Sequence, residues 1–255
     1  MVPQTQPDEA RPQGVWHWLG RVAFADTVAL QERLRAAVIA GSGPETLLLL
    51  EHHPVITMGR SAVPANVLVN EAELSRRGIA LHRASRGGDV TYHGPGQLVG
   101  YPVVTLRRGV RAHIEGMATA LAEVLAALGL PVLYRREAPG LWFSSGDAYQ
   151  KVCAFGVNVH RRVAIHGFAL NLDPILEHFS LIVPCGMAGC PVTSLRALTG
   201  AAPTPADLAA RVAAALGARL GVTFAAAPPP EDGANADRSC VSIATADSTI
   251  TMVGA

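Results

Sequence analysis

The stretch that constrains the fold most runs from Arg86 to Gln97 and reads Arg-Gly-Gly-Asp-Val-Thr-Tyr-His-Gly-Pro-Gly-Gln. Its glycines lack a Cβ, so the backbone can come very close to a ligand or adopt positive φ. The segment 97–104 follows and is predicted as a buried apolar strand. Composition alone fits either a pocket wall or an elaborate hairpin turn. The Arg, His and Tyr side chains favour the pocket wall, because a plain turn has no use for all three.

Length and composition limit the classes of protein to which the chain can belong. With 255 residues, 49% of them hydrophobic, it is long enough for one large domain or two small ones. A formal charge of +1 gives no indication of nucleic acid or an anionic membrane as a partner. No apolar run approaches the roughly 18 residues that span a bilayer, and residues 1–14 lack the apolar core of a signal peptide.

The cysteines and the basic residues each carry information. The four cysteines, without a Cys-x-x-Cys motif, favour reduced thiols and a cytoplasmic location; they are Cys153, Cys185, Cys190 and Cys240. Among 21 lysines and arginines the only lysine is Lys151. Arginine keeps its proton at any accessible pH, whereas a desolvated lysine can lose it. Lys151 is therefore either a chance survivor of codon bias or a position that needs a titratable amine.

Apolar periodicity and turn residues predict a chain of alternating strands and helices. Helices are expected at 24–39, at 112–128 before Gly129, and from Thr204 as cap to about Leu220, and Asn70 is expected to cap a short one. Strands are expected at 15–20, 46–51, 55–60, 79–83, 97–104, 131–134, 139–143, 151–160 and 163–172, the last two as a hairpin.

The ends of the chain differ in character from its middle. Residues 1–14 are expected to be a flexible N-terminal segment and 15–222 the catalytic domain. From Ala225 the sequence turns to Ala and Pro, so 223–255 is expected to be a mobile tail. Some strand propensity at 241–253 leaves a docked tail strand as an alternative.

Cys185 is the candidate nucleophile. It lies between Pro184 and Gly186 at the end of an apolar run, where a turn can expose its sulfur to a substrate. Only a few per cent of a free thiol is thiolate at neutral pH, and a nearby ammonium raises that fraction. Lys151 can supply the charge and later take a proton, although the spacing does not prove that the two meet. The alternative for Cys185 is a small buried hydrophobe.

The remaining polar residues favour structural roles. A zinc site would need His52, His53, His93 or His166 beside Cys185, but the sequence has no His-x-x-x-His, so no metal is expected. Asp89 is interpreted as a turn stabiliser. The Arg-Arg pairs at 76–77, 107–108, 135–136 and 161–162 are interpreted as solvated faces, some of which can steer an acidic partner.

Four segments together resemble the lipoyl(octanoyl) transferases: residues 86–97, Lys151-Val-Cys-Ala-Phe-Gly156, His166-Gly-Phe-Ala-Leu-Asn171 and Pro184-Cys-Gly186. The resemblance covers about 15–200. It implies the biotin/lipoate protein ligase-like fold, a mixed α/β domain in which a curved sheet flanked by helices forms an acyl pocket. It also implies transfer of octanoyl, or lipoyl, from acyl carrier protein to a lysine of lipoyl domains in the glycine cleavage H protein or 2-oxoacid dehydrogenase complexes. No ATP, metal or other cofactor is implied, and a monomer is expected.

Carried over residue by residue, the resemblance makes Cys185 the acyl-thioester nucleophile and Lys151 the lysine that activates it. It assigns substrate binding to Arg86, Gly87, Gly88, Asp89, Val90, Thr91, Tyr92, His93, Ala154, Phe155, Gly156, Gly167, Phe168 and Ala169. Asp89 and Phe155 stand where the family also uses other side chains. The loop at 144–150 is longer than the family pattern, and 225–255 lies outside the resemblance.

Three other functions remain open from the sequence. An ATP-dependent lipoate ligase on the same fold needs an adenylate site and no catalytic cysteine, so Cys185 favours transfer. A non-catalytic acyl-binding regulator has no use for both Cys185 and Lys151. A thiol hydrolase would release the acyl group to water without an acceptor protein.

Overall fold

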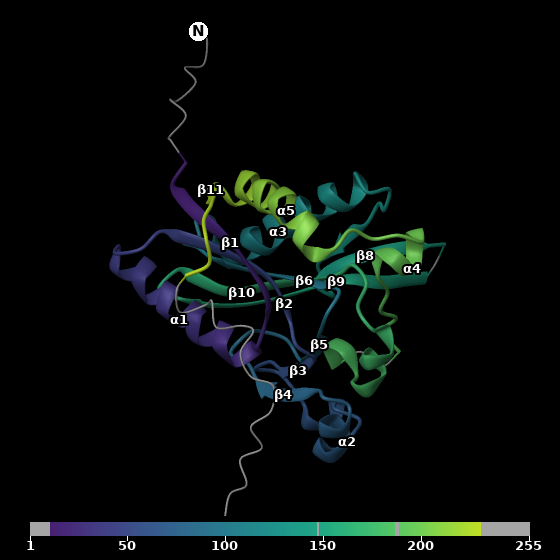
Figure 1. The fold of residues 1–255 in the computed structure, drawn as a ribbon. Helices are drawn as coiled ribbons and strands as arrows, with labels where there is room; N and C mark the ends of the chain where they lie inside the picture. The colour runs from purple at the N-terminus through teal and green to yellow at the C-terminus, as the bar shows by residue number, and fades with distance from the viewer. Residues whose placement is uncertain (1–10, 147, 187–188, 231–255) are drawn as a thin grey trace, which may run out of the picture.

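An eight-stranded sheet forms the centre of the molecule, with helices on both of its faces (Figure 1). The computed structural model describes residues 11–146, 148–186 and 189–230, with Cys185 as backbone alone. The sheet has the order β11-β1-β2-β6-β10-β9-β8-β7. Its strands are β1 (Gln13–Val22), β2 (Glu45–His52), β6 (Gln97–Val103), β7 (Leu133–Arg135), β8 (Gly140–Ser145), β9 (Ala148–His160), β10 (Val163–Asn171) and β11 (Thr223–Ala226).

Both strand directions occur in this sheet. β1 pairs in parallel with β2 and with β11, whereas the neighbours from β2 to β7 pair antiparallel. The mixed α/β class predicted from the sequence is therefore confirmed. The expected hairpin is also present, since β9 and β10 turn at Arg161 and Arg162, whose positive φ values of 45° and 67° make the tight turn.

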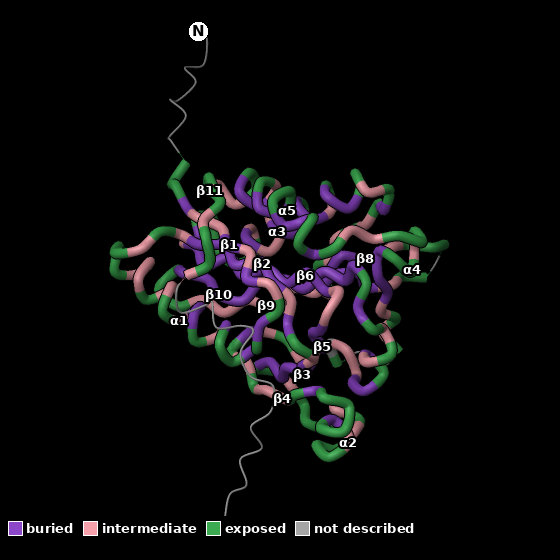
Figure 2. The backbone as a smooth tube through the Cα atoms, viewed as in Figure 1, coloured by how far each residue is buried: buried purple, intermediate pink, exposed green. Residues whose placement is uncertain are grey.

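The helices cover the sheet from two sides. α3 (Gly109–Ala126) and α5 (Pro205–Leu220) lie on one face, packed against Leu47, Leu49 and Leu98. α1 (Phe24–Ala40) lies on the other, where Leu30 packs against Leu48 and Leu50. Because side chains alternate along a strand, one apolar strand feeds both cores. Figure 2 shows the buried backbone concentrated between these layers. The short α4 (Leu195–Thr199) precedes α5.

A second, three-stranded sheet of order β4-β3-β5 lies beside the α1 face (Figure 1). It comprises β3 (Val55–Met58), β4 (Ala80–Arg83) and β5 (Val90–His93), with α2 (Glu71–Arg76) beside them. Three short 3₁₀ turns complete this part: η1 (Pro64–Asn66), η2 (Leu176–Leu181) and η3 (Pro184–Gly186). Ile56, Leu74 and Tyr92 form a core of its own there. The glycine-rich stretch is therefore only in part a turn, since Val90–His93 is a strand.

Local signals placed the helix ends well. The Asn70 side chain accepts from Glu73 N, as predicted, and Thr204 forms a capping box with Asp207. Gly129 adopts φ 82° after α3. The helix begins at Gly109, three residues before the predicted start, because the apolar stripe does not include its exposed first turn.

The large sheet extends beyond the expected limits of the domain at both ends. Gln13 and Gly14 belong to β1, and Thr223–Ala226 forms β11, paired with β1 from Gln13↔Thr223 to Trp16↔Ala226. Backbone hydrogen bonding along a sheet edge needs no apolar periodicity, so the pattern did not reveal it. The remainder of the tail, 231–255, and residues 1–10 lie outside the described residues. The expected loop at 144–150 is instead the extended β8–β9 hairpin.

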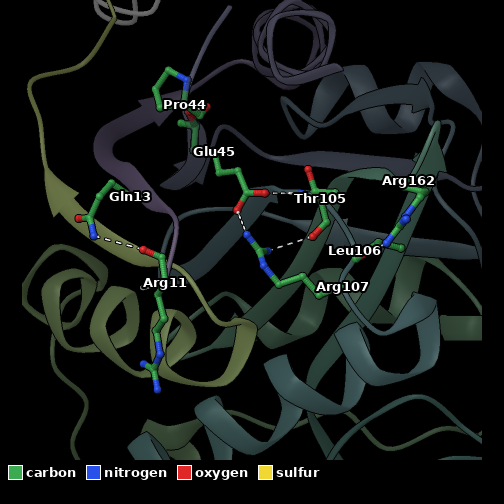
Figure 3. Close-up of polar contacts among 9 residues, drawn as sticks. Arg11, Gln13, Pro44, Glu45, Thr105, Leu106, Arg107 and Arg162 are labelled. Atoms are coloured by element: carbon green, nitrogen blue, oxygen red, sulfur yellow. Dashed lines mark hydrogen bonds and ion pairs between the residues drawn. The ribbon is translucent and has the colours of Figure 1, made fainter. Parts of the chain in front are cut away.

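A polar corner joins the β6–α3 connection to the start of β2 (Figure 3). The Glu45 carboxylate accepts from Thr105 N and from the Arg107 guanidinium, both at 2.9 Å. Arg162 donates to Leu106 O at 3.1 Å. These two arginines therefore hold chain segments together and are not simply solvated. In the described part of the chain, no helix is long and apolar enough to cross a membrane.

Candidate active site

The glycine-rich segment is held by backbone hydrogen bonds to the chain that follows β3. Gly59 N donates to Asp89 O at 3.1 Å, Arg60 N to Arg86 O at 3.0 Å and Ser61 N to Gly88 O at 3.1 Å. A Cβ on Gly59 would lie 2.3 Å from Gly88 O, so only glycine permits this approach. Gly87 N donates to Val157 O at 3.0 Å, which ties the segment to β9 as well.

Arg86 organises this segment from inside. Its side chain is 9% exposed. The guanidinium donates to Thr57 O at 2.6 Å, to Asp89 O at 2.8 Å and to Gly87 O at 3.1 Å. With the backbone bonds above, all four carbonyl oxygens of 86–89 accept hydrogen bonds from within the protein. Arg86, predicted to bind substrate, therefore also fixes the backbone of the glycine-rich segment.

Asp89 connects the glycine-rich segment to the Pro184-Cys185-Gly186 turn. Its carboxylate accepts from Asn66 Nδ2 at 2.5 Å, from Val90 N at 2.8 Å and from Val63 N at 3.3 Å, which confirms the predicted turn-stabilising role. Gly186 has φ 67°, and a Cβ there would lie 2.6 Å from Asp89 Oδ2. Val183 N donates to Asn66 O at 2.8 Å. The backbone around Cys185 is thus seated against the residues that hold Asp89.

Lys151 lies near the start of β9 with only 4% of its surface exposed. Its Nζ lies 4.6 Å from the centre of the Trp142 ring. Its backbone pairs with the far end of the loop that carries Cys185, since Lys151 N donates to Pro191 O at 2.8 Å and Thr193 N donates to Lys151 O at 2.9 Å. That loop is therefore anchored near Lys151 at one end and near Asp89 at the other.

A cavity of about 540 Å³ lies between the glycine-rich segment and Lys151. Lys151 lines it, together with twelve of the fourteen predicted substrate-binding residues: Arg86, Gly87, Gly88, Asp89, Val90, Thr91, His93, Ala154, Phe155, Gly156, Gly167 and Ala169. The structure thus brings β5, β9, β10 and the glycine-rich segment to one site.

Two predicted substrate-binding residues do not line the cavity. Tyr92 is fully buried in the core of the small sheet, where its hydroxyl forms a hydrogen bond of 2.8 Å with His178 Nδ1. Phe168 packs over Gly100, where a Cβ would meet its ring at 2.1 Å. Both lie between cavity-lining neighbours on a strand, and strand side chains alternate between faces. A contiguous motif therefore includes residues that point to the opposite core.

Three buried imidazoles in or beside the cavity stay uncharged. Burial lowers the pKa of His52 to about 4, although its Nδ1 donates to Val22 O. Burial, then Arg86 and Arg35, lowers the pKa of His166 to about 3. Burial also holds the pKa of His93 well below its usual range, while its Nδ1 donates to Gln97 Oε1 at 2.7 Å. His93 and His166 line the cavity.

Several lining residues were not assigned to the site from the sequence. Phe24, Tyr101 and His166 form part of the inner end, and Val110 and Ile114 of α3 stand on its walls. Five more residues also line it: Arg60, Glu137, Ala138, Pro139 and Val157. His166 adopts φ 58°, with its N–H bonded to Gln31 Oε1 at 2.7 Å. Its place at the head of a matching motif was a usable signal. Ile114 was expected only on the apolar face of the helix 112–128, and Val110 lies before the expected start of that helix.

The cysteines occupy different positions. Cys185 lies in η3, and its side chain lies outside the described residues, as does Cys240. Cys153 is buried, and burial raises the pKa of its thiol far above the ordinary value. Cys190 is half-buried. In the ranges described, no three or more His, Cys, Asp and Glu side chains are grouped to hold a metal ion.

Known proteins share both the sequence and the fold. Residues 24–217 match the family model of the lipoyl protein ligase A/B catalytic domain. An octanoyltransferase of Chloroflexus aurantiacus is 42% identical over 219 residues, covering 84% of this chain and 96% of that protein. An octanoyltransferase of Geotalea uraniireducens is 46% identical over 199 residues, covering 77% and 88%.

Solved structures agree at the level of the fold. A bi-partite lipoate protein ligase from Thermoplasma acidophilum superposes with a TM-score of 0.69 at 15% identity, covering 87% of this chain and 89% of that one. Lipoate-protein ligase A bound with ATP gives 0.70 at 15% identity, covering 87% and 91%. The chain therefore belongs to the lipoyl protein ligase A/B catalytic domain family and is an acyltransferase of the octanoyltransferase group.

Proposed function

We propose that this chain takes an octanoyl group from acyl carrier protein onto the sulfur of Cys185 and passes it to the lysine of a lipoyl domain. The relatives named octanoyltransferase support the acyl group. The Thermoplasma ligase, which is described together with its E2 lipoyl domain, supports the acceptor class. One observation carries the proposal: Lys151 and Asp89 line one cavity, and Asp89 lies against the residue that follows Cys185.

The cavity suits an acyl chain. Its two lining imidazoles are neutral at pH 7, because burial lowers the pKa of His166 to about 3 and holds the pKa of His93 well below its usual range. Gly156 and Gly167 let the backbone of β9 and β10 form the wall, and a Cβ on Gly167 would lie 2.3 Å from Gly100 O. Burying about seven methylenes at roughly 0.8 kcal/mol each provides on the order of 5–6 kcal/mol for selecting the chain length.

The reaction proceeds in two transfers. The Cys185 thiolate attacks the thioester carbon of the carrier protein, the carrier sulfur leaves and takes the proton that Lys151 gives up, and an octanoyl-enzyme forms. The acceptor lysine amine then attacks the enzyme thioester, an amide forms, and the Cys185 sulfur leaves. Lys151 as ammonium stabilises the thiolate, and as amine it takes the proton that the acceptor loses. An amide is more stable than a thioester, so the reaction requires no ATP, metal or other cofactor.

The thiol chemistry also suggests where the protein works. A nucleophilic cysteine must stay reduced, which fits the cytoplasm. A monomer is sufficient, because the glycine-rich segment, Lys151 and the Cys185 turn come from one chain. The lipoyl domains of the glycine cleavage H protein and of 2-oxoacid dehydrogenase complexes are the proposed acceptors.

A mass measurement tests the transfer. The protein is incubated with octanoyl carrier protein and a lipoyl domain, without ATP, and the products are weighed. We expect an octanoylated lipoyl domain from the native protein and from Cys190→Ser, the matched control, and none from Cys185→Ser. Product that requires ATP would reassign the protein to the ligases. Octanoate released without acceptor would indicate a hydrolase, and binding without turnover would indicate a regulator.

The role of Lys151 needs a separate variant. Lys151→Arg keeps a positive charge but cannot act as a base. We expect it to form the octanoyl-enzyme and to stall before transfer, so that the acyl-enzyme accumulates in single-turnover experiments. Normal transfer by Lys151→Arg would show that Lys151 is not the base.

A further inference from the structure

The indole ring of Trp142 lies under the amine of Lys151. Nζ is 4.6 Å from the ring centre, and the two side chains are 3% and 4% exposed. An ammonium over the face of a tryptophan is attracted by the ring quadrupole, and the attraction is largest at desolvated sites. Trp142 does not line the cavity, but it contacts two residues that do: Lys151 through its ring face and Ala138 through its indole N–H.

A β-bulge places these two residues opposite each other. β8 and β9 pair Leu141 with Cys153, but the next pair is Trp142 with Lys151, so Val152 is left as the extra residue of β9. Without this shift Trp142 would face Val152. Directly opposed residues of an antiparallel pair project to the same face, so the bulge turns the ring toward Lys151.

The ring is fixed from its other sides. Trp142 Nε1 donates to Ala138 O at 3.0 Å. The Arg135 guanidinium lies 5.5 Å from the ring centre, is paired with Glu137 at 2.7 Å and lies 4.5 Å from the Tyr149 ring. A Cβ on Gly140 would lie 3.0 Å from Lys151 Cε and 3.1 Å from Trp142 Nε1. Ring and amine are therefore packed in one arrangement.

We propose that Trp142 is a positioning residue for the transfer reaction: its indole face fixes the Lys151 ammonium at the wall of the acyl cavity. The inference rests on the proposed role of Lys151. The Lys151 ammonium is buried on a flexible side chain, so it needs a partner that holds it in place. That partner must not occupy the N–H groups that bond to the Cys185 thiolate and the acceptor amine. An aromatic face attracts the charge and leaves the N–H groups directed elsewhere.

Two substitutions separate the aromatic face from the hydrogen bond. Trp142→Phe and Trp142→Leu both lose the bond to Ala138, but only phenylalanine keeps an aromatic face. We expect kcat to fall about two- to threefold for Phe and about tenfold for Leu, with KM for octanoyl carrier protein unchanged. Tyr149→Leu removes the outer contact of Arg135 and serves as the control, with native kcat.

A spectroscopic signature shows the contact directly. Because Lys151 is the only lysine, protein made with ¹³Cε-lysine gives one side-chain signal. We expect its ε-protons to be shifted upfield by the ring current in the native protein, less so in Trp142→Phe, and not in Trp142→Leu. A signal at the free-lysine position in the native protein would overturn the inference.

The kinetic result distinguishes this inference from the proposed function. If Lys151→Arg stalls transfer while Trp142→Leu turns over at the native rate, the inference is wrong and the function stands. If Lys151→Arg is fully active, the role of Lys151 is wrong, and the inference falls with it. Equal losses of kcat in Trp142→Phe and Trp142→Leu would also overturn it, since the hydrogen bond and not the face would then matter.

Discussion

The glycine after Cys185 offers the sharpest perturbation of the site. Gly186 adopts φ 67°, and a Cβ there would lie 2.6 Å from Asp89 Oδ2, where ordinary contact begins at 3.4 Å. Gly186→Ala must therefore move the turn or the carboxylate by several tenths of an ångström. Asp89 is held by Asn66, Val63 and Val90, so most of the movement falls on the turn that carries Cys185.

The cost can be divided between strain and displacement. A non-glycine residue at this φ costs roughly 1–2 kcal/mol, which is the expected fall in the free energy of unfolding. A displacement approaching 1 Å in a catalytic group costs on the order of 100-fold in rate. We therefore expect Gly186→Ala to lower kcat/KM for octanoyl transfer about 100-fold, far more than its small loss of stability explains.

A double-mutant cycle with Asp89→Ala tests the assignment. Asp89→Ala removes the carboxylate that a new Cβ would meet, so Gly186→Ala should cost much less activity in that background, about tenfold or below. The assays are ATP-free octanoyl transfer and urea unfolding. Equal effects of Gly186→Ala in the two backgrounds would refute the contact between the glycine-rich segment and the Cys185 turn.

Three further predictions concern stability. Gly96 has φ 82°, and a Cβ there would lie 2.1 Å from the backbone O of Asp173. Gly96→Ala should therefore lower the free energy of unfolding by at least about 2 kcal/mol. A smaller loss in urea unfolding would contradict the close approach. Unfolded His52 takes up a proton near pH 6.5, whereas folded His52 does so only near pH 4. The free energy of unfolding should therefore fall on acidification through this window, by on the order of 3 kcal/mol from this residue alone. A flat pH profile in urea titrations would show that the imidazole is not buried in its neutral form. Thr204→Ala should cost about 1 kcal/mol through loss of the cap of α5, whereas the exposed Thr119→Ala should cost less than about 0.5, and equal thermal shifts would contradict the capping.

The helices and strands were predictable where the signal is local. Asn70 and Thr204 mark helix starts through their own side chains, and Gly129 marks an end through its positive φ. β11 was missed because it is four residues long and depends on pairing with β1, far away in sequence. In β1, position 14 requires glycine, because a Cβ would lie 2.6 Å from the Glu45 carbonyl oxygen of the neighbouring strand. Such contacts leave no periodic pattern.

The motifs predicted which segments meet at the cavity, and they predicted less well which side chains form its walls. The glycine-rich segment and Lys151 line one cavity, as the motifs indicated. Tyr92 and Phe168 belong to the same motifs but face buried cores, because strand side chains alternate. Trp142 meets Lys151 only because a bulge shifts the register of β8 against β9, and a bulge is set by tertiary pairing.

The location of the acyl group tests the central claim most directly. The protein is mixed with octanoyl carrier protein without acceptor and digested with trypsin, and the peptide 163–196, which holds both Cys185 and Cys190, is fragmented by mass spectrometry. We predict an octanoyl thioester on Cys185 that hydroxylamine removes and that a lipoyl domain, added before digestion, takes up. Octanoyl on Cys190, or an enzyme that transfers octanoyl while Cys185 stays unmodified throughout, would contradict the account.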